Sequence, residues 1–165
     1  GHYLDVNNAL DGEGPFTPQR SGSLPVGQLI ELCFSGQYTK AELKQLNKGR
    51  GGLIDLLGTA DLRDLERRYK EGEQAVVDTL DAMAYQISKW ITSMIPAFDG
   101  EPIDQILLTG GAARCKVVVD YIKTHVGAVG CGVTVYPGEN EMAALVKGAL
   151  RVLSGKEKAK DYRPR

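Results

Sequence analysis

The chain has 165 residues, of which 42% are hydrophobic and 25% are charged, and its formal net charge at pH 7 is −1. This composition is typical of one globular domain with a sizeable core and excludes an intrinsically disordered chain. The near-neutral charge gives no electrostatic reason to expect a nucleic-acid or anionic-membrane partner, and no apolar run reaches the length of a transmembrane helix.

The number and spacing of the cysteines and histidines predict neither a zinc site nor catalysis by histidine. The three cysteines, at positions 33, 115 and 131, are too widely spaced to predict a zinc site, so we expect reduced, mostly buried thiols in a cytoplasmic protein. His2 stands at the start of the sequence and His125 near the end of a predicted helix. We therefore expect no general acid–base mechanism based on histidine.

The first part of the chain predicts a strand, a loop and several helices. Residues 3–8 have the pattern of a short strand, and the glycine- and proline-rich segment 11–22 predicts a loop. A helix is expected over 25–34, with proline in its first turn. The pair Thr39 and Glu42 matches a capping box that starts a second helix, ending near residue 46.

The middle of the chain contains the strongest periodic signal. Segment 50–59 is bounded by glycines and fits neither a helix nor a strand clearly, whereas 61–70 predicts a helix. Over residues 73–97 apolar side chains recur every three or four positions in a wide stripe. We therefore expect a long helix packed between other layers of the fold.

The last third of the chain alternates between strand and helix patterns. An apolar run over 103–109 is followed by Gly110 and Gly111 and by a helix that starts near residue 114 and ends at 125. A second strand over 132–136 leads to a helix over 141–153. This order predicts an α/β layered domain with two parallel strands, and residues 156–165 are predicted to be a solvated tail.

The Gly110–Gly111 turn is the first candidate for a ligand site. Glycines let a ligand approach the backbone, and the start of a following helix offers free N–H groups to a phosphate. Alternatively, the glycines serve only to turn the chain from strand to helix. The segment has neither the GxGxxG spacing of a dinucleotide-binding loop nor the GK[ST] of a Walker A loop.

Arg20 in the predicted loop is the second candidate. A guanidinium group matches the oxygens of a phosphoryl group in bidentate geometry, and phosphoryl transfer requires positive charge near those oxygens. The alternative is a surface arginine that pairs with Asp11 or Glu13.

Two pairs of residues at helix starts are the remaining candidates. Asp61 and Arg63 are suited to hydrogen-bond a ribose or flank an adenine ring. The alternative is that Thr59 or Asp61 caps a helix, which needs no ligand. Glu139 and Glu141 follow the second predicted strand. They are suited to hold magnesium, or they are only favourable acids in the first turn of a helix.

Four segments in this order together resemble the butyrate kinases, which belong to the acetate kinase-like branch of the actin, hexokinase and Hsp70 superfamily. They are Asp5–Phe16, Arg20–Gly22, Leu107–Gly111 and Tyr136–Met142. The resemblance runs from about residue 5 to the end of the last helix. It implies a C-terminal ribonuclease H-like domain over residues 1–165, with a mixed sheet flanked by helices and its first strands missing.

The resemblance also implies an activity, which is ATP-dependent phosphorylation of a short-chain carboxylate to an acyl phosphate with Mg²⁺. It implies that Arg20 stabilises the phosphoryl group during transfer. Glu141, or Glu139 if the match shifts slightly, is implied to be linked to the metal. The residues implied to bind ATP or ADP are Gly110, Gly111, Ala112, Asp61 and Arg63.

The sequence departs from the family pattern in two places. The upstream phosphate loop and the N-terminal domain with most of the carboxylate pocket are missing, so we expect this chain alone to be inactive. In the acetate kinases the glycine turn continues Gly-Glu-Asn, whereas here it continues Ala112-Ala-Arg114, which weakens the expectation of side-chain contacts there. Two alternatives stay open: a nucleotide half-site or dimerisation module, which fits an expected homo-oligomer, and another acetate kinase-like carboxylate kinase.

Overall fold

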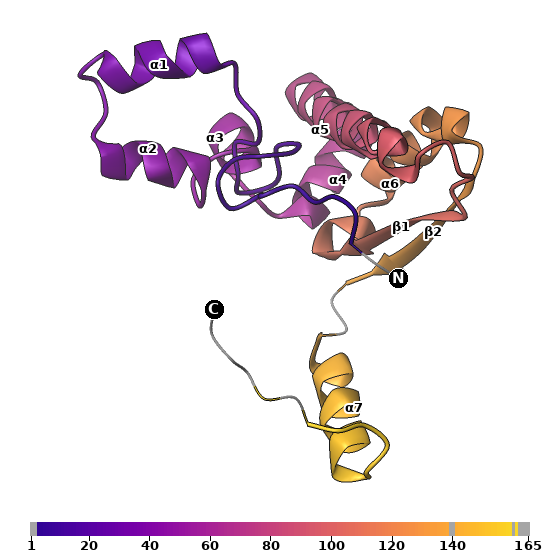
Figure 1. Cartoon of the computed structure of the whole chain (residues 1–165). Coiled ribbons are helices and arrows are strands. Elements are labelled where there is room, and N and C mark those ends of the chain that lie inside the picture. Colours follow the sequence, from indigo (N-terminus) through magenta and orange to yellow (C-terminus); the bar gives the residue numbers. More distant parts are fainter. Residues whose placement is uncertain (1–2, 139–140, 160, 162–165) are drawn as a thin grey trace.

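The computed structural model describes residues 3–138, 141–159 and 161, without the side chain of Glu141. The chain forms a helix-rich α/β body from which two parts extend (Figure 1). Its α-helices and strands are α1 (Val26–Phe34), α2 (Lys40–Asn47), α3 (Leu53–Leu57), α4 (Leu62–Lys70), α5 (Gln74–Ser93), β1 (Gln105–Gly110), α6 (Lys116–His125), β2 (Gly132–Pro137) and α7 (Glu141–Leu153). Its 3₁₀ helices are η1 (Ile95–Phe98), η2 (Gly111–Arg114) and η3 (Gly127–Val129).

The sheet in the described part of the chain consists of β1 and β2, which are parallel as predicted. Gln105 pairs with Gly132 at one end and Gly110 with Pro137 at the other. Helix α6 connects the two strands. No antiparallel strand of the expected mixed sheet lies within the described ranges.

Helix α5 is the centre of the core and packs against α6, α4 and α3. Apolar residues three or four positions apart put one face of the helix inside, where Val76, Leu80 and Met83 are almost fully buried. The helix ends at Ser93, earlier than predicted, and continues as η1. Pro96 explains this end because proline cannot donate the backbone hydrogen bond that an α-helix needs.

The expected strand over residues 3–8 is not formed. The backbone N–H of Asn8 donates to Glu13 Oε2 at 2.6 Å, and its side-chain amide donates to Asp11 Oδ2 at 2.7 Å. These local hydrogen bonds form a turn at the end of the segment. A strand needs a neighbour for its backbone groups, and no described strand pairs with this segment.

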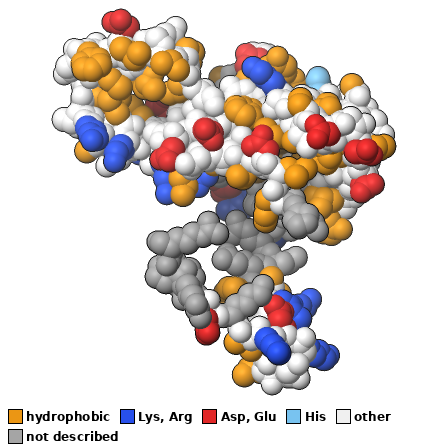
Figure 2. Space-filling model, in the orientation of Figure 1, with side chains coloured by type: hydrophobic (Ala, Val, Ile, Leu, Met, Phe, Trp, Pro, Cys, Tyr) orange, Lys and Arg blue, Asp and Glu red, His pale blue; other side chains and the backbone are white. Residues whose placement is uncertain are grey.

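Two helical parts lie outside the body (Figure 1). Helices α1 and α2 project together at one end, and α7 lies beyond the sheet. Phe34 at the end of α1 is 86% exposed, and Leu153 at the end of α7 is 82% exposed. Figure 2 shows hydrophobic side chains gathered on the visible face of the α1–α2 pair. Among the helices that the structure describes, none combines the length and hydropathy needed to cross a membrane.

Candidate nucleotide site

A pocket of about 430 Å³ lies between the start of α4 and the segment that follows β1. It brings Asp61 and Arg63 together with Gly111 and Ala112, which are about fifty positions away in the sequence. The other lining residues are Pro18, Ala60, Leu62, Glu66, Arg114 and Cys115. Four of the five predicted nucleotide-binding residues therefore share one cavity, and the fifth, Gly110, immediately precedes it in β1.

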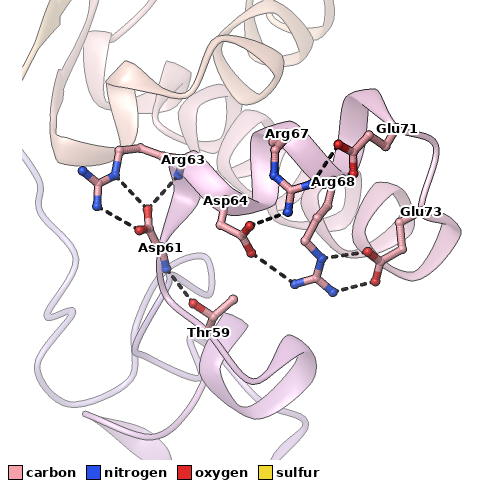
Figure 3. Close-up of polar contacts among 8 residues, drawn as sticks. All are labelled: Thr59, Asp61, Arg63, Asp64, Arg67, Arg68, Glu71 and Glu73. Carbon is pink, nitrogen blue, oxygen red and sulfur yellow. Dashed lines mark hydrogen bonds and ion pairs between the residues drawn. The ribbon is translucent and has the colours of Figure 1, made fainter.

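Asp61 and Arg63 bind each other at the rim of this pocket (Figure 3). Asp61 is the N-cap of α4 and accepts a hydrogen bond from the backbone N–H of Arg63 at 3.0 Å. Arg63 Nε and Nη2 also donate to its carboxylate, at 3.0 and 2.9 Å. This bidentate pairing lowers the pKa of Asp61 to about 2. Asp61 therefore does cap α4, as one of the two alternatives predicts. The Asp61–Arg63 pair also lines the cavity with polar groups.

Further ion pairs lie along α4 (Figure 3). Arg67 pairs with Asp64 and with Glu71, each at 2.7 Å. Arg68 binds Glu73, the residue that precedes α5, at 2.5 Å, and its hydrogen bonds lower the pKa of Glu73. Exposed pairs of this kind add little stability one by one. The pairs of Arg67 run along α4 itself, whereas the Arg68–Glu73 pair links α4 to the residue that precedes α5.

Glu66 ties the two walls of the pocket together. It accepts a hydrogen bond from the backbone N–H of Lys116 at 3.4 Å and pairs with Lys70 at 2.7 Å. Its side chain is only 17% exposed. The neighbouring Cys115 is buried, and this burial raises the pKa of its thiol, which keeps it protonated near neutral pH.

The Gly110–Gly111 turn is open on the pocket side. Gly110 has a backbone φ of +88° and exchanges two backbone hydrogen bonds with Gly138, at 2.9 and 3.3 Å. Among the residues that the structure describes, apart from its chain neighbours, none has an atom within 4 Å of a Cβ added at Gly111. The α-helix expected from about residue 114 begins at Lys116 instead, because the 3₁₀ helix η2 comes first. The phosphate-binding start of an α-helix directly after the glycines is therefore not formed.

Arg114 lines the same pocket, and the sequence patterns had not singled it out as a ligand-binding residue. Its guanidinium group lies against the backbone of Gly138, at the end of β2. A Cβ at Gly138 would overlap Arg114 Nη2 and lie 3.0 Å from Cζ. The signal that could have identified it is a cation three positions after Gly111.

Arg20 lies in a tightly held turn beside the pocket. The N–H of Thr17 donates to the Arg20 carbonyl at 3.0 Å, and the residue forms an antiparallel bridge with Lys48. Arg20 is half-buried and does not line the pocket, whereas Pro18 of the same turn does. No ion pair between Arg20 and an acidic residue occurs in the described ranges.

The proposed metal residues cannot be placed as side chains. Glu139 lies outside the described residues, and Glu141 is described only as the first residue of α7. Elsewhere in the described chain, no group of three histidine, cysteine or acidic side chains is arranged to hold a metal ion.

The three cysteines are free, as expected. Cys115 is buried and Cys131 is partly buried, but Cys33 is exposed. The expectation of mostly buried thiols therefore does not hold for Cys33, which lies on the projecting α1 helix.

Comparison with known proteins finds similar sequences among the butyrate kinases. No family model matches the chain. The chain is 48% identical over 162 residues to a probable butyrate kinase of Clostridium botulinum and 47% identical over 163 residues to butyrate kinase 2 of Clostridium acetobutylicum. A probable butyrate kinase of Listeria monocytogenes is 46% identical over 162 residues. These matches cover 98–99% of this chain and 45% of each relative.

Two solved structures share the fold. The acetate kinase of Porphyromonas gingivalis matches with a TM-score of 0.70 and 21% identity, over 84% of this chain and 41% of that one. A propionate kinase of Francisella tularensis matches with a TM-score of 0.64 and 17% identity, over 73% of this chain and 30% of that one. The chain therefore has the fold of this part of the acetate and propionate kinases, and over nearly its whole length it is similar to butyrate kinases, of which it spans about 45%.

Proposed function

We propose that this chain is the nucleotide side of an ATP-dependent butyrate kinase of the cytoplasm. The full-length protein would transfer a phosphoryl group from ATP to the carboxylate of butyrate or a related short-chain acid, giving an acyl phosphate. The chain spans about 45% of the length of the butyrate kinases that it matches, so the activity belongs to the whole protein.

The observation that carries this proposal is the shared pocket of α4 and η2. Asp61 and Arg63 present a carboxylate and a guanidinium group at one wall, and across the pocket Gly111 and Ala112 add no large side chain of their own. A volume of about 430 Å³ lies within the range of small-molecule sites. A flat base and its ribose fit a cavity with small residues on one side and polar groups on the other.

The position of Arg20 suits a role in phosphoryl transfer. Its turn borders the pocket through Pro18, so phosphates that extend from a bound nucleoside past Pro18 would approach the guanidinium group. In phosphoryl transfer the protein contributes mainly positioning and charge stabilisation. The backbone hydrogen bonds that hold the turn therefore matter because they fix the direction of this charge.

Magnesium would supply further positive charge to the phosphates. Mg²⁺ usually keeps several waters and takes only one or two protein carboxylates together with the substrate phosphates. A single glutamate is therefore a sufficient donor from this chain, and we propose Glu141, or alternatively Glu139, for that role.

The test is acyl phosphate formation by the full-length protein with ATP, Mg²⁺ and butyrate, trapped as the hydroxamate. We expect Arg20→Ala to lower kcat by about 30- to 1,000-fold, which corresponds to about 2–4 kcal/mol of transition-state stabilisation. The matched control is Lys89→Ala, which removes an exposed cation on α5 and should leave kcat unchanged. A wild-type protein that forms no acyl phosphate, or an Arg20→Ala variant with full turnover, would contradict the proposal.

A second role is favoured by the apolar surfaces outside the body. Met142 of α7 is 73% exposed and Val26 of α1 is 69% exposed, and surfaces of this kind are suited to contacts with another domain or a second copy. On this proposal the isolated 165-residue chain is a nucleotide half-site or dimerisation module. We expect it to form no acyl phosphate in the same assay, and acyl phosphate formed by this piece alone would contradict that role.

A further inference from the structure

Arg114 occupies a position that the family resemblance does not explain. It stands at the end of η2, where the acetate kinase pattern has no arginine, and it lines the same pocket as Asp61, Gly111 and Ala112. We propose that Arg114 is a nucleotide-binding residue that contacts the phosphate groups of ADP and ATP. This inference rests on the proposed function, because it assigns a ligand to one more residue of that site.

The geometry at the end of β2 is fitted to this guanidinium group. Gly138 is buried, has a backbone φ of +90° and is bound to Gly110 by two backbone hydrogen bonds. Any side chain at Gly138 would occupy the space of the Arg114 head group. The Arg114 guanidinium group therefore packs against the end of β2, next to the Gly110–Gly111 turn.

The charges in the pocket distinguish Arg114 from its neighbour Arg63. The guanidinium group of Arg63 is held in a bidentate pair by Asp61, so much of its charge is compensated. The ion pairs found in the described part of the chain include none with Arg114. Glu66 is likewise paired, with Lys70, so Arg114 is the cation in this lining to which a phosphate would be drawn, and the anion should lie on the Arg114 side.

The location of Arg114 also implies that the phosphates and the base of a nucleotide bind at different ends of the pocket. Asp61 and Arg63 lie at the start of α4, whereas Arg114 lies across the pocket, next to the end of β2. A nucleotide with its ribose at Asp61 would place its phosphates toward β2. Arginine suits this role because its planar guanidinium group can bind two phosphate oxygens at once.

The experiment is calorimetric titration of the full-length protein with ADP and, separately, with adenosine. Wild type is compared with Arg114→Ala and with the control Lys123→Ala, which removes an exposed cation from the far end of α6. We expect Arg114→Ala to weaken ADP binding by about tenfold or more, as expected for the loss of a charge-assisted contact. Adenosine binding should stay within about twofold of wild type, since its contacts lie elsewhere. Lys123→Ala should bind both ligands as wild type does.

Three outcomes would overturn the assignment of Arg114. If ADP and adenosine weaken equally, Arg114 only maintains the shape of the pocket. If ADP affinity does not change, the residue has no role in binding, and the proposed function still stands. If wild type binds neither ligand, the nucleotide site itself is wrong and both proposals fail. Should Arg114→Ala not fold, Arg114→Lys keeps the charge but loses the bidentate geometry, and it should still weaken ADP more than adenosine.

Discussion

Two glycine pairs in this molecule have opposite surroundings. Gly51 and Gly52 precede α3 and are buried against the Arg20 turn, where a Cβ at Gly52 would overlap the carbonyl oxygen of Thr17. A Cβ at Gly110 or Gly111, beside the pocket, would meet no described atom within 4 Å other than those of its chain neighbours. The first pair is therefore required by the fold itself. The packing of this chain does not explain Gly111, and a bound ligand would.

The same contrast separates the two halves of the candidate site. The Arg20 turn is fixed by neighbours within the chain: the N–H of Gly49 donates to Gln19, and the N–H of Leu53 donates to Thr17, at 2.8 and 3.2 Å. The loop is further tied to α5 because Gln86 Oε1 accepts a hydrogen bond from the N–H of Phe16 at 3.1 Å. The residues around Gly111, in contrast, leave a cavity. The Arg20 turn is thus held by hydrogen bonds within the chain, whereas the backbone at Gly111 borders an open cavity.

The largest effect on stability is expected from Gly52→Ala in the full-length protein. Its backbone φ of +64° costs an alanine about 1–2 kcal/mol, and the overlap with Thr17 adds a further cost of about 1–3 kcal/mol. Urea unfolding should therefore show a loss of about 2–5 kcal/mol. The matched control is Gly58→Ala, whose φ is +75° but whose Cβ would meet no atom within 4 Å. Equal losses in the two variants would show that the contact with Thr17 is unimportant.

A smaller and different effect is expected from Gly111→Ala. Because the position is open and has no positive φ, the unfolding free energy should change by no more than about 0.5 kcal/mol. ADP binding should weaken by about tenfold, since the new methyl group would stand where the nucleotide approaches. Gly127→Ala, at an equally open position outside the pocket, should leave ADP binding unchanged. An unchanged ADP affinity in Gly111→Ala would mean that no ligand approaches this backbone.

The elements that depend on local pattern could be predicted from the sequence. The periodicity of α5 placed Leu80 and Met83 in the core, and the capping box of Thr39 and Glu42 is formed, with the N–H of Glu42 donating to Thr39 Oγ1 at 3.3 Å. The two parallel strands also followed from the order of apolar runs.

What depends on contacts between distant segments could not be read from the sequence. Segment 50–59 was ambiguous because the close neighbours of Gly52 are Thr17 and Arg20, which lie more than thirty positions earlier in the sequence. Residues 3–8 have a strand pattern but no described partner strand. Arg114 was not identified because its role depends on Gly138, which only the pairing of β1 with β2 brings near.

The smallest effect concerns the ionisation of Asp61. The paired guanidinium group of Arg63 lowers the pKa of Asp61 to about 2, so the folded state favours the ionised form. The stabilisation from this pair is present above the ordinary value near 3.8 and is lost as the pH falls toward 2. Carboxylate NMR titration of Arg63→Met should show the pKa of Asp61 moving up toward 3.8.

The matched control is Arg67→Met, which should leave the pKa of Asp61 unchanged and raise that of Asp64, since Arg67 is the main cause of the lowered pKa of Asp64. A pKa of Asp61 that is the same in wild type and Arg63→Met would show that the pair is not formed in solution.

The most direct test of the central claim is a crystal structure of the full-length protein with ADP and Mg²⁺. The account predicts that the adenine and ribose lie between Asp61 and Gly111, that the phosphates approach Arg114, and that the Arg20 turn faces the terminal phosphate. ADP bound at any other place, with the pocket between α4 and η2 empty, would contradict it.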